Sequence, residues 1–257
     1  MNNVGAYMKI TDFIEIKDYY KKAGQSGKLG VAIDEAGKKY LLKQGHYGEP
    51  ANEYVYSLVA NKIGVSCQTC HLVEGIGVPV VAIEYISSMS DSVRKKFNNR
   101  LIIGDLVKAM TLDALTWQDD NLQYIIGTDG KFYKIDNSES FGYSKYEESL
   151  FETRQEEIIK DRLLQIENDS ARFVAFLNDC KANIIKRYGV LQVSNFDEVL
   201  EKFTKTNFSF LKEDKELATV YSKEAYKYFL ARINAIKTAI TCFKNEEFSA
   251  QADTEMG

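Results

Sequence analysis

The chain has 257 residues, of which 45% are apolar and 27% charged, as in ordinary soluble globular proteins. This length allows one large domain or two lobes, and a net charge of −4 gives no reason to expect a nucleic acid or an anionic membrane as partner. No apolar run approaches the roughly 20 residues that span a bilayer, and the N-terminus lacks a signal-peptide pattern. We therefore expect cytoplasmic residence, while secretion by a signal-less route stays open.

The first 86 residues are typical of an antiparallel sheet with one helix. Residues 1–20 predict a short helix or an edge strand, and a β-hairpin turning at Glu35-Ala36-Gly37 is predicted further on. The glycine-rich stretch before this hairpin consists of Gly24, Gln25, Ser26, Gly27 and Lys28. Backbone N–H groups of such a loop can approach phosphate oxygens, and Ser26 and Lys28 would add donors. Because loops are also glycine-rich for conformational reasons, both interpretations stay open.

Lys43 ends the second strand of this hairpin. The next segment predicts a helix, with Pro50 in its first turn and Gly64 at its end. Glu53 falls in the first turn, on or beside the face that packs onto the sheet. A carboxylate there can pair with a lysine of the neighbouring strand and hold it toward a phosphate. The alternative for Lys43 is an ordinary solvated surface charge.

Two further strands are predicted over 65–73 and 78–86, followed by a linker over 87–91. Cys67, Cys70 and His71 match the short pattern of c-type haem attachment. That pattern needs an export route and a distal ligand, and the sequence indicates neither. We therefore interpret these cysteines as packing residues of a strand.

Beyond residue 87 the apolar spacing becomes helical. A helix is predicted over 102–115, and a shorter one over 195–210 with Ser194 or Asn195 as its cap. Two longer helices are predicted from apolar stripes, which consist of Ile159, Leu163, Ile166, Phe173 and Leu177, and of Ala225, Phe229, Ile233, Ile236, Ile240 and Phe243. The tail 249–257 lacks large apolar residues and is expected to be disordered.

The stretch between Leu115 and Asp136 is the most informative. It begins with a polar loop that contains Asp119, Asp120 and Asn121. A hairpin follows, with Gly127-Thr-Asp-Gly130 as its turn. Because a hairpin returns the chain to its starting point, the polar loop should lie close to Asp136. Oxygen ligands that converge there could hold Mg²⁺, although an ordinary polar loop before a surface hairpin is the alternative.

The order of these parts resembles the protein-kinase-like superfamily: a glycine loop, a strand lysine, a helix glutamate, a hinge-like strand, a carboxylate loop and a strand-end aspartate. In detail the sequence looks most like the HipA-like serine/threonine kinases in their short bacterial form. The motifs that carry this resemblance are Gly24-Gln-Ser-Gly-Lys28, Tyr40-Leu-Leu-Lys43, the helix from Asn52 to Gly64, Val80-Val-Ala-Ile-Glu-Tyr85 and Phe132-Tyr-Lys-Ile-Asp136.

The resemblance implies an α+β, bilobal protein-kinase-like fold. Residues 1–86 would form an antiparallel β-rich N-lobe, and residues 87–248 a mainly helical C-lobe with the catalytic loop and the metal-binding hairpin. The implied activity is transfer of the γ-phosphoryl group of ATP, with Mg²⁺ as cofactor, to a hydroxyl. A serine or threonine of an unidentified protein or peptide is the favoured acceptor.

Roles follow from the resemblance residue by residue. Lys43 would contact the α- and β-phosphates, and Glu53 would orient it. The backbone of Glu84 and Tyr85 would meet adenine at the hinge. Asp136 would bind Mg²⁺. Asp119, with Asp120 as the alternative, would accept the proton of the substrate hydroxyl.

The sequence departs from the family at the second metal ligand. The usual asparagine stands five positions after the catalytic aspartate, whereas here Gln123 stands four after Asp119, and Asp120 replaces the usual basic residue. Gln123 or Asn121 could supply the oxygen instead. A lost ligand would leave a nucleotide-binding pseudokinase that serves as a partner-binding module. A small-molecule kinase of the aminoglycoside type is a third interpretation, disfavoured because Trp117-Gln118-Asp119 replaces the usual His-x-Asp.

Overall fold

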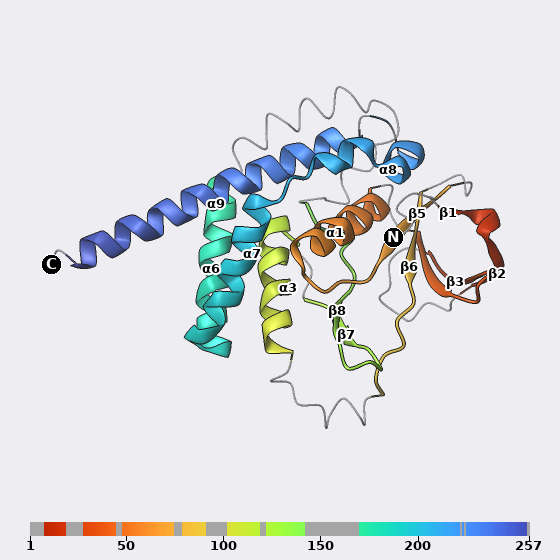
Figure 1. The fold of residues 1–257 in the computed structure, drawn as a ribbon, viewed down its shortest axis with the longest axis horizontal. Helices are drawn as coiled ribbons and strands as arrows, with labels where there is room; N and C mark the ends of the chain where they lie inside the picture. The colour runs from red at the N-terminus through yellow and green to blue at the C-terminus, as the bar shows by residue number, and fades with distance from the viewer. Residues whose placement is uncertain are drawn as a thin grey trace.

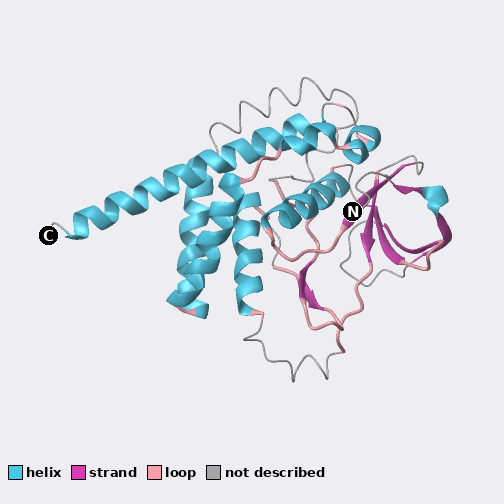
Figure 2. Ribbon diagram, viewed as in Figure 1, coloured by secondary structure: helices cyan, strands magenta, loops and turns pink. Residues whose placement is uncertain are grey.

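The computed structural model describes residues 8–18, 28–44, 48–74, 79–90, 102–118, 122–141, 170–221, 223 and 225–255. A six-stranded sheet occupies one end of the molecule, helices make up most of the other end, and helix α1 lies between them (Figures 1 and 2). The expected α+β class is confirmed in this form, as a curled sheet followed by a mainly helical C-terminal part. The finer bilobal, kinase-like arrangement and the boundaries 1–86 and 87–248 stay predictions.

The sheet has the strand order β1-β5-β6-β4-β3-β2. All pairs are antiparallel except β1 with β5, which is parallel. The strands are β1 (Met8–Lys9), β2 (Phe13–Asp18), β3 (Lys28–Asp34), β4 (Lys39–Gln44), β5 (Cys70–Glu74) and β6 (Val80–Glu84), with a 3-10 turn η1 (Ile10–Asp12) after β1. The predicted hairpin is confirmed, because β3 and β4 are joined at Gly37, whose φ of 78° suits glycine.

The register of the sheet decides which side chains share a face with Lys43. In β4, Lys43 stands opposite Val81, and Leu41 stands opposite Ile83. Since side chains alternate along a strand, these four lie on one face, which packs toward α1. Side chains such as Tyr40, Leu42 and Ala82 form a separate core on the opposite face.

Helix α1 (Glu49–Ile63) is the scaffold of Glu53. Pro50 stands in its first turn, where a missing N–H costs nothing. Gly64 ends it with φ of 76°, a left-handed conformation in which the Gly64 amide donates to the carbonyl of Asn61. The predicted helix is confirmed at both ends. Most of its side chains are buried, because the sheet covers one side and the helical part another.

The helical part is built from α3 (Ile103–Thr116), α6 (Ser170–Tyr188), α7 (Val193–Lys205), α8 (Lys215–Val220) and α9 (Ala225–Glu255), with 3-10 turns η4 (Val190–Gln192) and η5 (Ser209–Glu213). Helix α9 runs across α6 and α7 and continues beyond them (Figure 1). The stripe from Phe229 to Phe243 is buried as predicted, whereas residues 159–166 of the first stripe lie outside the described residues.

Two predictions in this part are wrong. Neither Ser194 nor Asn195 caps α7, which begins at Val193 after Gln192; Ser194 instead donates to the carbonyl of Leu191. The tail from 249 was expected to be disordered, but α9 continues to Glu255. Alanine, glutamine and glutamate are good helix formers, and adding residues to an existing helix avoids the cost of nucleation.

The hairpin before Asp136 consists of β7 (Tyr124–Ile126) and β8 (Phe132–Lys134), with Gly130 in its turn at φ of 79°. Isolated bridges join it to the rest of the chain, from Lys134 to Cys67 and from Gly127 to Ser88. The predicted hairpin is confirmed, although the second strand ends before Ile135. Among the described helices, none combines the length and the apolar character needed to cross a membrane.

Candidate functional site

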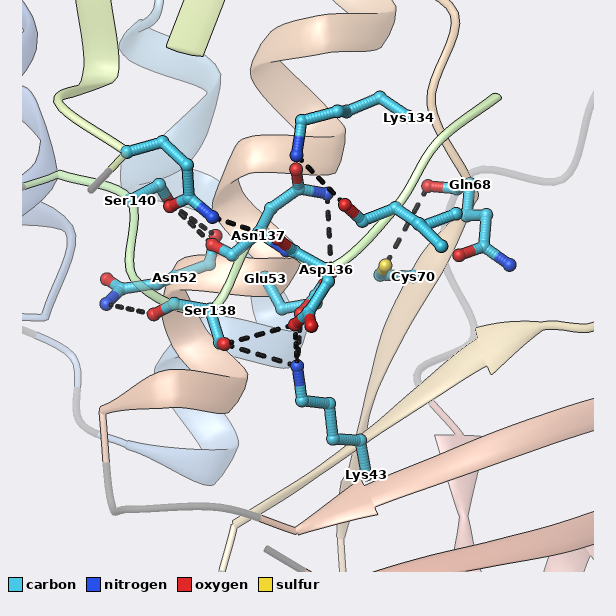
Figure 3. Close-up of polar contacts among 12 residues, drawn as sticks. Lys43, Asn52, Glu53, Gln68, Cys70, Lys134, Asp136, Asn137, Ser138 and Ser140 are labelled. Carbon is cyan, nitrogen blue, oxygen red and sulfur yellow. Dashed lines mark hydrogen bonds and ion pairs between the residues drawn. The ribbon is translucent and has the colours of Figure 1, made fainter. Parts of the chain in front are cut away.

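Lys43 lies where three separate elements meet, and its ammonium group contacts a side chain from two of them (Figure 3). Its Nζ lies 3.1 Å from Oε2 of Glu53 on α1 and 3.2 Å from Oγ of Ser138, and it also pairs with Oδ1 of Asp136. The side chain of Lys43 is only 13% exposed. Burial alone would lower the pKa of Lys43, but Glu53 and Asp136 outweigh it and raise that pKa. Lys43 is therefore held in its charged form.

Asp136 follows β8 with a backbone conformation that non-glycine residues rarely adopt, at φ of 57°. Its side chain stays 37% exposed while the Lys43 ammonium contacts one oxygen. Burial would raise the pKa of Asp136, but Lys43 outweighs this and the pKa is lowered, so the carboxylate stays ionised. Backbone strain of this kind clusters at functional sites, where surrounding contacts maintain it.

One of the contacts that hold Asp136 comes from Gln118, which directly precedes the predicted carboxylate loop. Its Nε2 donates to the carbonyl of Asp136 at 2.9 Å. Its other amide atom, Oε1, is buried and has no hydrogen-bond partner within the described part of the chain. Gln118 therefore ties the end of α3 to the residue that carries the candidate metal-binding carboxylate.

The residues after Asp136 hold Glu53 in place. Oε1 of Glu53 accepts hydrogen bonds from the backbone N–H of Asn137 at 2.9 Å and from its Nδ2 at 3.3 Å. The neighbouring Asn52 donates from Nδ2 to the carbonyl of Ser138 at 3.0 Å. Two consecutive residues of α1 thus meet two consecutive residues of this loop, and Glu53 keeps its second oxygen for Lys43.

Sequence reasoning assigned no role to Asn137, Ser138, Asn52 or Gln118. The available signal was adjacency, because each is a polar residue within two positions of a predicted site residue in the chain. Adjacency in the chain does not indicate where a side chain points. The contacts that matter join residues as far apart in sequence as Glu53 and Asn137.

The structure brings together three of the predicted residues, Lys43, Glu53 and Asp136. The backbone carbonyl of Gln123 accepts a hydrogen bond from the N–H of Ile135, the residue before Asp136, at 3.1 Å. Lys28 is described only as the first residue of β3. The remaining predicted residues lie outside the described ranges, namely Gly24, Gln25, Ser26, Gly27, Asp119, Asp120 and Asn121.

The adenine contact of Glu84 and Tyr85 stays a prediction, and their backbone groups have the following partners within the chain. The amide of Glu84 donates to the carbonyl of Thr69, and its own carbonyl accepts from Nε2 of Gln68 at 3.3 Å. The amide of Tyr85 donates to the carbonyl of Lys39. Three of the four backbone groups that a base would use are therefore already hydrogen-bonded. The side chain of Glu84 lies on the face opposite Lys43, in ion pairs with Lys38 and His71.

The cysteines of the haem-like pattern pack into the structure. Cys70 is buried in the core, and burial raises its pKa. Cys67 accepts a weak hydrogen bond from Nδ2 of Asn137 at 3.5 Å. Within the described ranges, no group of three or more His, Cys, Asp and Glu side chains is arranged to hold a metal ion. A divalent cation at Asp136 would therefore need further oxygens, either from residues outside the described ranges or from a bound phosphate.

Mg²⁺ bound together with a polyphosphate would meet that condition. Mg²⁺ commonly binds through one or two carboxylates together with phosphate oxygens and water. Asp136 offers an ionised and partly exposed carboxylate, Ser138 a hydroxyl, and Lys43 a cation for phosphate oxygens. The arrangement can therefore pair a phosphate with Lys43 and a hard cation with Asp136.

No family model matches the chain, and no curated protein matches it. One solved structure with similarity is the crystal structure of a Helicobacter pylori proinflammatory kinase, CtkA. The similarity covers 92% of this chain and 99% of that one, at 12% sequence identity and a TM-score of 0.48. At that level it carries no argument about chemistry, which rests on the contacts of Lys43, Glu53 and Asp136.

Proposed function

We propose that the chain is an ATP- and Mg²⁺-dependent phosphotransferase that moves the γ-phosphoryl group to a hydroxyl, with a protein serine or threonine as acceptor. The observation that carries this proposal is the double pairing of Lys43 with Glu53 and Asp136. Each residue comes from a different element, β4, α1 and the segment after β8. A buried lysine destabilises the fold unless its charge is paired. A site that keeps Lys43 charged with two carboxylates therefore indicates a function for that charge.

The sheet beside Lys43 supports a nucleotide as ligand. Leu41 stands two positions before Lys43, opposite Val31 on β3 and Ile83 on β6. Leu41 and Val31 are partly exposed, so an apolar surface borders the lysine on the same face. Ligand sites commonly combine apolar surface with a few placed polar groups. A purine base would suit the apolar surface while its phosphates reach Lys43.

Each residue has a definite task in the proposed reaction. Lys43 binds phosphate oxygens, and Glu53 keeps its ammonium oriented when Asp136 is engaged elsewhere. Asp136 holds the cation, with Gln123 as a candidate neighbour. Mg²⁺ supplies charge neutralisation at the phosphates. Because little covalent chemistry falls to the protein in phosphoryl transfer, positioning and electrostatics account for most of the catalysis.

The test measures radiolabel transfer from γ-labelled ATP to the chain itself and to a mixed protein acceptor, with Mg²⁺ and with EDTA. We expect Mg²⁺-dependent transfer that Lys43→Met removes and that Lys39→Met retains. Lys39 is a matched control, since it is an exposed lysine of the same strand. Thermal-shift titration with ATP accompanies the assay. Stabilisation by nucleotide without any transfer would identify the chain as a nucleotide-binding pseudokinase. The absence of both stabilisation and transfer would overturn the proposal.

A further inference from the structure

A short C-terminal segment contacts the chain on both sides of Glu53. We call residues 214–221, which comprise α8 and its flanking residues, the C-terminal strap. The hydroxyl of Tyr221 accepts the backbone N–H of Ala51 at 3.0 Å. The hydroxyl of Tyr54 donates to Oδ2 of Asp214 at 2.9 Å. The strap is therefore attached to α1 at the residue after Glu53 and at a residue two positions before it.

The contact at Ala51 satisfies a group that the helix itself cannot satisfy. The first N–H groups of an α-helix have no partner within the helix. The N-cap residue of α1, Gly48, provides no side-chain hydrogen bond to the first turn. A hydroxyl from the strap thus replaces a missing local cap, so the first turn of α1 depends on a residue 170 positions later in the chain.

The strap is anchored to the sheet as well as to α1. Oε2 of Glu216 accepts the backbone N–H of Leu72 on β5 at 2.6 Å, and Oε1 lies 3.6 Å from Nδ1 of His71. Leu217 is buried in the core that includes α1. Asp214 also caps α8 itself, by accepting the N–H of Leu217 at 2.8 Å. The strap therefore fixes α1 relative to the sheet that carries Lys43.

The start of α9 reaches the other side of the site. The hydroxyl of Tyr228 donates to the carbonyl of Phe141 at 3.1 Å, and the rings of Phe141 and Phe229 meet edge to face. Phe141 closes the segment that begins at Asp136 and contains the partners of Glu53. The strap and the start of α9 thus contact both the helix that carries Glu53 and the segment that follows Asp136.

We propose that the C-terminal strap is a positioning element for the site, which sets the distance between Glu53 and Lys43 by holding the first turns of α1. With the strap released from α1, Glu53 would be held by Asn137 and Lys43 alone, so the distance between Glu53 and Lys43 would vary more while the core stays folded. This inference rests on the proposed phosphotransfer for its activity readout, and its structural readout is independent of it.

The test uses the full chain with the double variant Tyr54→Phe/Tyr221→Phe, which removes two hydroxyls and little volume. Tyr226→Phe in α9 is the matched control, and Glu216→Gln with Glu213→Gln forms a second pair. Glu213 is an exposed residue of η5, close to Glu216 in the chain. Hydrogen exchange of the peptide that covers residues 49–57 reports the order of α1. Initial rates with γ-labelled ATP report kcat and KM.

We expect exchange in the first turns of α1 to rise at least tenfold in the double variant and in Glu216→Gln, and kcat to fall about tenfold with KM for ATP changed less. We also expect the loss in kcat to disappear in a Glu53→Gln background, because the strap acts through Glu53. An equal loss in that background would indicate general destabilisation and overturn the proposal. Exchange that matches Tyr226→Phe would overturn it too. If the wild-type chain transfers no phosphate, the proposed function fails. The exchange result alone then decides whether the strap orders the first turns of α1.

Discussion

Lys134 and Asp113 form an ion pair inside the protein, with Nζ 3.7 Å from Oδ2, although Lys134 stands two positions before the partly exposed Asp136. Lys134 is fully buried. Its Nζ also donates to the carbonyl of Ile135 at 2.9 Å, and Asp113 accepts from the hydroxyl of Tyr56 at 2.7 Å. The pair therefore joins β8, α3 and α1 in the protein interior, two residues from Asp136 in the chain.

Removing the charge of Lys134 should destabilise the protein strongly. Lys134→Met leaves the Asp113 carboxyl buried without its cation, which typically costs about 3–5 kcal/mol. Urea denaturation measures the free energy of unfolding of this variant. Lys131→Met is the control, since the side chain of Lys131 is 74% exposed in the same hairpin and should change stability by less than about 0.5 kcal/mol.

A second substitution separates charge from volume at this pair. Adding Asp113→Asn to Lys134→Met removes the orphaned charge, so part of the lost stability should return. Burial raises the pKa of Asp113 to about 6, against the opposing effects of Lys134 and Tyr56, which already indicates how unfavourable its ionised form is. A double variant no more stable than Lys134→Met would contradict a charge penalty.

His71 should make stability depend on pH in a definite direction. Burial would lower its pKa, but hydrogen bonds with Glu216 and Glu84 outweigh this and raise the pKa to about 9. A group whose pKa is raised in the folded state contributes stability that is complete below the unfolded value of about 6.5 and is lost as pH rises through about 9. The free energy of unfolding should therefore fall between pH 6.5 and 9.

The measurement compares wild type with His71→Gln by urea denaturation at pH 6 and pH 9. We expect the advantage of wild type over the variant to shrink by about 1–3 kcal/mol across this range. Taking the difference between the two proteins removes the titration of every other group that both share. An advantage that stays constant would show that the imidazolium form of His71 contributes nothing to the stability of the fold.

Local patterns in the sequence were sufficient for the elements that frame the site. Pro50 and Gly64 fix the ends of α1, and the glycines of two turns fix the hairpins, because each acts through its own backbone conformation. Lys43, Glu53 and Asp136 could be paired in advance only through their order along the chain. Their contacts join positions far apart in sequence, so spacing alone gives no distance.

The residues that support the site could not be predicted for the same reason. A lysine within a strand is usually solvated, and nothing near Lys134 indicates that Asp113 will face it across the core. The strap is a stronger case, since Ala51 gives no local sign that a tyrosine hydroxyl will accept its N–H. The helical tail was missed because its small and polar residues lack an apolar stripe, yet they extend a helix that already exists.

Gln118 should affect binding of the cation more than stability. Gln118→Leu removes the hydrogen bond from Nε2 to the carbonyl of Asp136, a contact worth about 0.5–1.5 kcal/mol. If it positions Asp136, the Mg²⁺ concentration for half-maximal nucleotide stabilisation should rise by up to about tenfold. Thermal-shift titration with Mg²⁺ at fixed ATP measures this. An unchanged midpoint would mean that Asp136 is held without Gln118.

Asp136 offers the sharpest test of function against stability. Its φ of 57° is unfavourable for most residues and free of strain for glycine. Asp136→Gly should therefore keep the free energy of unfolding within about 1 kcal/mol of wild type, the relieved strain offsetting the lost ion pair with Lys43. Asp136→Asn keeps a side chain that tolerates this conformation but removes the charge. Both should reduce phosphotransfer by about a hundredfold to a thousandfold, the loss that typically follows removal of a charge-stabilising group. Activity that fell only in proportion to the loss of folded protein would remove the metal role from Asp136, because the substitution would then act through folding alone.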